Sequence, residues 1–379
     1  MSAGACAPRL CGRYPSSARA AAAPSSNSSE TLDEIFTRTN ATATGRPPHE
    51  FGDGVCSRRL LSRLLATVVC LVALPAVAEP AVWLFPAVGR RDEVTVSGRV
   101  LKEAPRGQHT LSRNVRSLTA EKWEGAPVTL ALEGQTQKAT SSSEGDFTVT
   151  FSFKDKPLDA GIHFVEARVP GAVGKAGVQL LDDAAPFLVI SDLDDTLSVT
   201  NVLHKKQLAE AALLEDGNSQ PAVPGMAPFY RCLLAEKDLK PAVAVVTGTP
   251  IQFVPRTLVF LNKNDFPFAA VYPRELSFTT LSGYKQPVIR RLFQQLPHKA
   301  LCVGDSGEKD PEVYAQMREE FPDRVLRVYI HDVGRDEDPA RFKGMVLFKD
   351  AREAAADAVA HGYMSQACLD RELLAPGKP

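Results

Sequence analysis

The sequence lacks several features that would place it in a common class of protein. Its 44 Lys and Arg residues are balanced by 45 Asp and Glu residues. With no basic stripe, nucleic acid is a poor candidate for a partner. No Cys-x-x-Cys or mixed Cys/His spacing of a metal site is present. No apolar run reaches the roughly 20 residues of a spanning helix, and we find no basic amphipathic helix suited to a bilayer surface.

Cysteines are few in the chain after residue 71. Four of the seven precede residue 71, which leaves Cys232, Cys302 and Cys368. Cys302 falls in a predicted core strand and Cys232 on a predicted helix, so both are interpreted as small buried hydrophobic residues. The spacing does not indicate a disulfide framework.

The first 78 residues have the composition of a leader rather than of a folded domain. Residues 1–57 are rich in Ala, Ser, Arg and Pro and are predicted to be disordered. Residues 58–78 combine a basic start, an apolar stretch and a final Ala-Val-Ala, which is typical of a secretory signal peptide. This predicts export to the periplasm or cell envelope by the Sec or twin-arginine route, or membrane anchoring if the signal is not cleaved. A buried core helix is the alternative.

The signal begins far inside the chain, whereas such signals begin proteins. We therefore expect residues 1–54 to be a start-site artefact, with Val55 as a GTG-initiated methionine of a bacterial gene.

Residues 85–183 show a hydrophobic period of two. The segments 94–101, 127–132, 147–153 and 162–169 alternate or nearly alternate, and Gly-containing turns separate them. Short strands at this spacing predict a small all-β sandwich. Its partner is unknown, no chemistry is visible in it, and the isolated His109 and His163 are not expected to bind metal.

The most informative segment of the chain starts at Pro186. An apolar run, Phe187 to Ile190, leads directly into Asp192-x-Asp194-x-Thr196. The run predicts a buried strand, and ligands bind at the strand ends of open α/β sheets. One carboxylate can attack phosphorus, and a second can protonate the leaving oxygen and then activate water. Asp195 is expected to orient or cap the loop.

Three later segments supply groups that would complete a phosphate site. A second apolar strand ends at Thr247-Gly248, where a hydroxyl beside backbone N–H groups can hold a phosphoryl oxygen. Lys285 opens an amphipathic helix and can offset negative charge. Asp305 and Asp310 follow a third strand, where hard oxygen ligands suit Mg²⁺. Taken alone, each segment also has a purely structural interpretation. These are a Thr-Gly turn at Thr247, a solvent-exposed lysine at Lys285, and an Asx-type turn with a helix N-cap at Asp310.

In this order the segments resemble the haloacid-dehalogenase superfamily of phosphotransferases. The likeness is greatest to the catalytic domain of actin-patch-type phosphatidate phosphatases, and it covers roughly residues 184–350. Bacterial relatives of this family also carry a β module upstream. The motifs that carry the resemblance are Asp192-Leu-Asp-Asp-Thr-Leu, Val223-Pro-Gly-Met-Ala-Pro-Phe-Tyr-Arg231, Thr247-Gly-Thr-Pro250, Tyr284-Lys-Gln-Pro-Val-Ile289 and Gly304-Asp-Ser-Gly-Glu-Lys-Asp-Pro-Glu-Val-Tyr314.

The resemblance implies a role for each matched residue. Asp192 is the expected nucleophile, and Asp194 is the acid/base whose backbone carbonyl also meets the metal. Thr247, Gly248 and Lys285 are expected to bind phosphate. An acid at position 194 favours hydrolysis over phosphoryl storage. The metal ligands assigned in this way are Asp192, Asp194, Asp305 and Asp310.

We therefore expect two domains and an exported enzyme. A small β-sandwich at 85–183 precedes a Rossmann-like α/β domain at 184–350 with a parallel sheet and a small cap, and a C-terminal helix and tail occupy 351–379. The expected function is Mg²⁺-dependent hydrolysis of a phosphomonoester, with phosphatidate or a related membrane lipid phosphate as the substrate. A phosphatase for a soluble or protein phosphoester, and a non-catalytic cell-envelope binding protein, remain as alternatives.

Overall fold

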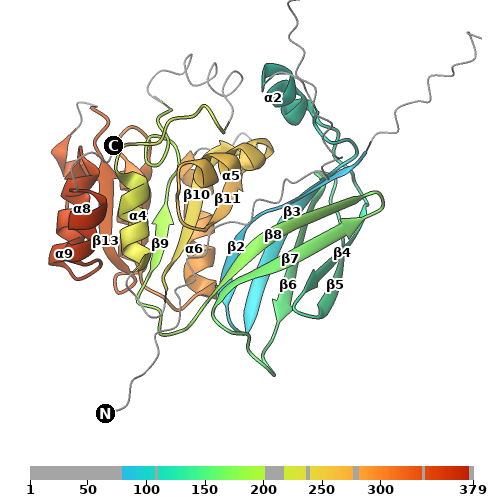
Figure 1. Cartoon of the computed structure of the whole chain (residues 1–379), viewed down its shortest axis with the longest axis horizontal. Helices are drawn as coiled ribbons and strands as arrows, with labels where there is room; N and C mark the ends of the chain where they lie inside the picture. The colour runs from blue at the N-terminus through green and yellow to red at the C-terminus, as the bar shows by residue number, and fades with distance from the viewer. Residues whose placement is uncertain are drawn as a thin grey trace, which may run out of the picture. The chain divides into compact units, whose positions relative to one another are not determined.

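The structure, a computed structural model, describes residues 79–106, 110–200, 217–235, 240–275, 281–334 and 338–374. All of them belong to one compact unit, in which an all-β part precedes an α/β part (Figure 1). The predicted disordered segment and signal peptide, His109 and most of the predicted cap lie outside the described residues. Among the helices within these ranges, none combines the length and hydropathy needed to cross a membrane.

The all-β part consists of two sheets that enclose one apolar core. A three-stranded sheet has the order β1-β3-β6, and a five-stranded sheet has the order β2-β8-β7-β4-β5. Every pair in these two sheets is antiparallel except β2 with β8. The elements are β1 (Ala81–Leu84), β2 (Ala87–Arg90), β3 (Glu93–Leu101), α2 (Thr110–Thr119), β4 (Pro127–Leu132), β5 (Gln135–Thr140), β6 (Asp146–Ser152), β7 (Gly161–Val169) and β8 (Ala172–Leu181).

Side-chain alternation explains why these residues form strands. In β6, Phe147, Val149 and Phe151 point into the core, while Thr148 and Thr150 point outward. The outward hydroxyls pair across the sheet with residues of β3, each at 3.0 Å. Such pairs fix the register, because a slip of one residue would expose every inward side chain.

The α/β part is built on a six-stranded sheet in which every pair is parallel. Its strand order is β11-β10-β9-β12-β13-β14, which confirms the predicted fold class. The strands are β9 (Leu188–Ser191), β10 (Ala242–Pro250), β11 (Ala269–Arg274), β12 (Ala300–Asp305), β13 (Val325–His331) and β14 (Val346–Phe348).

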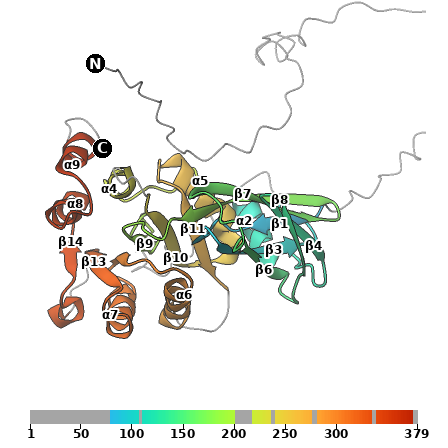
Figure 2. The same cartoon turned by 90° about the horizontal axis from the view of Figure 1, so that it is seen from below.

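Helices cover both faces of this sheet (Figure 2). One face carries α4, α5, α8 and α9, and the other carries α6 and α7, and each face buries its own apolar cluster. This explains why the central strands are apolar without alternation. The helical elements are α4 (Met226–Ala235), η1 (Ile251–Phe253), α5 (Val254–Lys263), α6 (Leu281–Gln295), α7 (Asp310–Glu320), η2 (Pro339–Phe342), α8 (Ala351–Ala360) and α9 (Gln366–Glu372).

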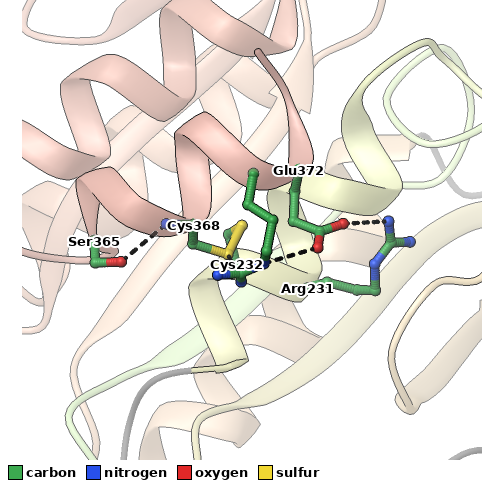
Figure 3. The surroundings of a disulfide bond; sticks show 6 residues. Arg231, Cys232, Ser365, Cys368 and Glu372 are labelled. Atoms are coloured by element: carbon green, nitrogen blue, oxygen red, sulfur yellow. Dashed lines mark hydrogen bonds and ion pairs between the residues drawn. A yellow bond between two sulfur atoms is a disulfide. The ribbon is translucent and has the colours of Figure 1, made fainter. Parts of the chain in front are cut away.

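A disulfide joins α4 to α9, which corrects the interpretation of Cys232 as an unpaired hydrophobic residue. Cys232 and Cys368 are bonded at 1.99 Å, while Cys302 is free and buried as predicted (Figure 3). Ser365 caps α9 by accepting a hydrogen bond from the backbone N–H of Cys368 at 3.1 Å. Arg231, beside Cys232, donates to Glu372 at 3.4 Å. The C-terminal helices are therefore fastened to the face that carries α4.

Candidate active site

Parallel pairing brings the predicted residues to one edge of the sheet. β9 lies between β10 and β12, with Ser191 opposite Val245 on one side and Val303 on the other. Asp192 follows β9 directly, Thr247 lies near the end of β10, and Asp305 ends β12. Because the carboxyl ends of parallel strands share an edge, three distant segments place their polar side chains together.

Lys285 of α6 lies among the acids of this edge. Its Nζ is 2.7 Å from Asp192 Oδ1, 2.5 Å from Asp310 Oδ1 and 3.2 Å from Glu308 Oε2. The lysine side chain is 2% exposed. Burial lowers the pKa of Lys285, but the carboxylates of Asp192, Asp310 and Glu308 outweigh burial and raise the pKa above its usual value. A permanent cation therefore touches the predicted nucleophile.

The acids outnumber this cation. Ligand atoms of Asp192, Asp305 and Glu308 lie within 4.8 Å of one another. Burial, followed by the neighbouring acid Asp310, raises the pKa of Asp305, and burial is also the main cause of the raised pKa of Asp192. Within the described part of the chain, Asp192 Oδ2 and Asp305 Oδ2 are buried without a hydrogen-bond partner.

These three carboxylates fit a divalent cation. Buried acceptor oxygens without donors are costly, and hard oxygen atoms are the ligands that Mg²⁺ or Ca²⁺ takes. The sequence did not indicate Glu308, although the run Gly304-Asp-Ser-Gly-Glu-Lys-Asp310 shows a third acid between the two that were chosen. What brings Glu308 into reach is the turn after β12, where its N–H and that of Gly307 donate to Asp305 Oδ1 at 3.0 and 2.6 Å.

Asp310, predicted as a metal ligand, lies outside the three-carboxylate group. Its Oδ1 binds Lys285, and its Oδ2 accepts from the backbone N–H of Asp305 at 3.3 Å. The side chain also packs against Gly304, where an added Cβ would lie 2.5 Å from Asp310 Oδ2. Glycine is therefore needed at position 304 for this approach, and Asp310 is placed to hold Lys285 and the loop.

Asp194, the predicted acid/base, faces the loop after β10. Its Oδ2 accepts from Thr249 Oγ1 at 2.8 Å and from Thr247 Oγ1 at 3.4 Å. The backbone N–H of Thr249 also donates to Thr247 Oγ1 at 2.9 Å, and Gly248 between them is partly exposed. Burial raises the pKa of Asp194, while the hydrogen bond from Thr249 lowers it. Thr249 is a site residue that the sequence argument missed.

Asp195 orders the loop that carries the two acids. It has a positive φ of 54°, which is unusual for a residue other than glycine. Its Oδ1 accepts from the backbone N–H of Thr200 at 2.7 Å and from the Thr200 hydroxyl at 3.2 Å. The Asp195 carbonyl accepts from His331 Nδ1 at 2.6 Å. The Asp195 side chain thus holds the backbone geometry of the loop.

A family model matches the region of the chain that contains this edge. Residues 187–332 match the family model of the catalytic domain of the phosphatidate phosphatase APP1. The match lies in the α/β part and covers less than half of the chain. The resemblance inferred from the motifs is therefore confirmed for the α/β part.

Two fungal proteins share this region. An uncharacterized protein of Schizosaccharomyces pombe is 29% identical over 158 residues, and the phosphatidate phosphatase APP1 of Saccharomyces cerevisiae is 27% identical over 151 residues. The matches cover 39% and 38% of this chain and 25% of each relative, so the chain spans about a quarter of the relatives' length. Among solved structures, a chain of the Pnkp1/Rnl/Hen1 complex aligns over 41% of this chain and 49% of its own, with 18% identity and a TM-score of 0.30.

Proposed function

We propose that the chain is a divalent-metal-dependent phosphatase that hydrolyses phosphatidate or a related lipid phosphate through a phosphorylated Asp192. One observation carries the proposal. The free oxygens of Asp192 and Asp305 lie buried in one carboxylate group beside Lys285. Packing gives no reason for such an arrangement, whereas a cation and a phosphate dianion do.

The chain's own residues supply both chemical steps. Asp192 attacks phosphorus, an Asp192 O–P bond forms and the ester P–O bond breaks, while Asp194 gives its proton to the leaving alkoxide. Asp194, now ionised, takes a proton from water. That water attacks phosphorus, the Asp192 O–P bond breaks and inorganic phosphate leaves. Thr249 holds Asp194 between the two steps, and Lys285 offsets the charge on the phosphoryl group.

Asp192, Asp305 and Glu308 would hold the metal ion, which we propose is Mg²⁺. When bound, the ion neutralises the charge that phosphate brings to a site already rich in carboxylates. The oxygen-only donor set suits Mg²⁺, Ca²⁺ and Mn²⁺, and the resemblance to the phosphotransferase family favours Mg²⁺ among them.

The decisive experiment is phosphate release from phosphatidate vesicles, soluble phosphomonoesters and a phosphopeptide, each with Mg²⁺ and with EDTA. Preferred turnover of phosphatidate that stops in EDTA is expected. Preference for a soluble ester or the phosphopeptide would replace the substrate assignment and keep the chemistry. If no substrate is turned over, the non-catalytic binding protein becomes the favoured alternative. Full activity in EDTA would show that the reaction does not require a metal ion.

Asp194→Asn separates the two proposed steps. It leaves the nucleophile and loses proton transfer, worth roughly 10²–10⁴ in rate. With nitrophenyl phosphate, a good leaving group, we expect a burst of nitrophenolate followed by slow turnover. Equal loss on good and poor leaving groups without a burst would show that Asp194 is not the acid/base.

Asp305→Ala and Asp310→Ala separate the metal ligand from the lysine partner. Asp305→Ala should shift the Mg²⁺ dependence strongly, because it removes one of three hard ligands. Asp310→Ala should lower activity about 10–100-fold at saturating Mg²⁺, since it supports Lys285 and the loop. If Asp305→Ala keeps the Mg²⁺ dependence of the wild type, Asp305 is not a ligand of the metal ion.

We also propose that the chain works outside the cytosol, as an exported protein. The disulfide Cys232–Cys368 supports this, because such bonds persist mainly in oxidising compartments. Fractionation of cells and N-terminal sequencing of the mature protein test the proposal. A full-length protein with free thiols at both positions in the cytosol would contradict it.

A further inference from the structure

The short helix η2 brings an arginine to the turn that carries Glu308. It lies in the connection between β13 and β14 and contacts α7. Asp338 caps η2 by accepting a hydrogen bond from the backbone N–H of Ala340 at 2.9 Å, and Phe342 packs against the apolar cluster that α6 and α7 cover. The helix is therefore fixed at both ends, and its Arg341 has a side chain that is 10% exposed.

The guanidinium of Arg341 binds backbone carbonyls of this turn. Its Nη1 donates to the Ser306 carbonyl at 2.6 Å, and its Nη2 donates to the Glu308 carbonyl. Nε and Nη2 also donate to the two carboxylate oxygens of Glu312 at 2.6 and 3.0 Å. The planar fork of arginine holds several acceptors in fixed directions. Arg341 thus connects the turn after β12 to the first turn of α7, where Glu312 lies.

Other groups hold the remaining sides of the turn. Two of its N–H groups donate to Asp305 Oδ1, as described above. The backbone N–H of Ser306 donates to the His331 carbonyl at 2.9 Å, and Ser306 Oγ accepts from the N–H of Val333 at 3.1 Å. The carbonyls at positions 306 and 308 are held by Arg341, so its contacts complete the restraint of the turn.

The restraint matters because the side chain of Glu308 lies among like charges. Ligand atoms of Asp192, Asp305 and Glu308 are within 4.8 Å of one another. Burial raises the pKa of Glu308, although Lys285 opposes the shift. Carboxylates at such distances repel one another, so a loosely held turn would carry Glu308 away from the group. A guanidinium on two backbone carbonyls prevents this without occupying a ligand atom.

We propose that Arg341 is a positioning residue of the metal site, which holds the turn so that Glu308 meets Asp192 and Asp305 before the cation binds. The inference rests on the proposed metal-dependent function, and it adds a residue that sets the affinity for the ion. A preorganised ligand set binds more tightly, because less order has to be imposed on binding. The sequence does not indicate this role, since Arg341 follows Glu308 by 33 residues in a segment without a motif.

Charge and positioning predict opposite effects when Arg341 is replaced. Arg341→Gln removes a positive charge close to a cation site, and by electrostatics alone it should strengthen the binding of a divalent cation. If Arg341 acts through the turn, the same variant should bind the cation about 10–100-fold more weakly, as is typical for groups that support metal ligands. The sign of the change therefore separates the two effects.

Binding of Mn²⁺ to the full chain, followed by electron paramagnetic resonance of the free ion, measures this affinity without turnover. Mn²⁺ takes the same oxygen ligands as Mg²⁺. Arg341→Gln should show the predicted loss, and Mn²⁺ should raise its melting temperature less than that of the wild type. With nitrophenyl phosphate, the Mg²⁺ concentration for half-maximal activity should rise, while activity at saturating Mg²⁺ should largely recover. An unchanged or tighter Mn²⁺ affinity would overturn the proposal.

Arg318→Gln is the matched control. Arg318 of α7 is half-buried and donates to the carbonyls of Gly344 and Lys343 at 2.8 Å each, so it holds the segment after η2. Its Mn²⁺ affinity should stay near that of the wild type, and an equal loss in both variants would reject the positioning role. If Arg341→Gln does not fold, Arg341→Lys keeps the charge without the planar fork. Its Mn²⁺ affinity should also fall, and wild-type affinity would overturn the proposal.

The wild type and Asp305→Ala separate failure of this inference from failure of the proposed function. If the wild type binds no Mn²⁺, or if Asp305→Ala binds it as tightly, the proposed metal site is wrong and this inference with it. If Asp305→Ala loses Mn²⁺ and Arg341→Gln does not, the positioning role alone is rejected. Mn²⁺ binding without turnover of any phosphoester would reject the proposed reaction, and the comparison of affinities would still decide the role of Arg341.

Discussion

Two buried cations show how differently the two parts of this molecule use charge. Arg99 in the all-β part has a side chain that is 3% exposed, and its guanidinium meets both oxygens of Asp146 at 2.6 and 2.7 Å. Lys285 at the candidate site is buried to the same degree, but it faces three acids. Arg99 is therefore matched by one carboxylate in charge and in geometry, whereas Lys285 is outnumbered by the carboxylates around it.

The difference separates a structural ion pair from a functional cluster. A bidentate pair satisfies its hydrogen bonds and offsets much of its own desolvation. A buried excess of carboxylates with free oxygens is destabilising until a ligand neutralises it, and proteins keep such conflicts at functional sites. Substitutions in the two places should therefore change different quantities.

Asp192→Asn is expected to have the largest effect on function. Turnover should fall by several orders of magnitude, because few groups can replace a nucleophile. The melting temperature without metal should be unchanged or higher, since one like charge leaves the cluster. Steady-state kinetics measures the turnover, and thermal unfolding without metal measures the melting temperature. Activity within about tenfold of wild type would reject the covalent step.

Arg99→Ala should have the opposite profile. It leaves Asp146 without its partner, which should cost about 3 kcal/mol of unfolding free energy, at the low end of the range for buried pairs because Asp146 is 25% exposed. Turnover per folded molecule should stay near wild type. Urea unfolding and activity in the same buffer test this. A loss of activity without a loss of stability would mean that the pair serves the site.

Removing the disulfide should cost a similar amount of stability. Cys232→Ala/Cys368→Ala should lower the unfolding free energy by about 2–4 kcal/mol, because the bond closes a loop across 136 residues of sequence separation. Wild-type protein in reductant should lose a similar amount, and the double variant should not respond to reductant. If reductant lowers the unfolding free energy of the wild type and of the double variant by the same amount, the loss does not come from this disulfide.

The strand-end residues could be predicted because they interrupt buried apolar runs. An acid after Ile190 or at Asp305 has no packing role, so the chemistry can be inferred before any geometry. Glu308 and Thr249 could not be chosen in this way. Each becomes a site residue only through a turn that points it at a neighbour, and polar residues in loops are common without such a role.

The fold was predictable where the hydrophobic period was strong. β3, β4, β6 and β7 follow the expected alternation, whereas β5 was missed because its sequence, Gln-Thr-Gln-Lys-Ala-Thr, carries no apolar stripe. It forms because the turn at Glu133-Gly134, with φ of 45° and 80°, returns the chain beside β4. The pairing of Cys232 with Cys368 depends on contacts among α4, α8 and α9 that no sequence spacing encodes.

The smallest expected effect tests whether the Arg99 pair is fully matched. Burial first, and then Asp146, raise the pKa of Glu275 above 4.5, its ordinary value. An acid whose pKa is higher in the folded state adds stability below its unfolded pKa and loses it as pH rises through the folded pKa. Glu275→Gln should therefore melt at the same temperature as wild type below pH 4.5 and slightly higher at neutral pH. The gain should be small because Glu275 is exposed. No gain at neutral pH would show that Arg99 neutralises both acids, whereas a gain as large as the Arg99→Ala loss would place an unmatched buried charge in the all-β part as well.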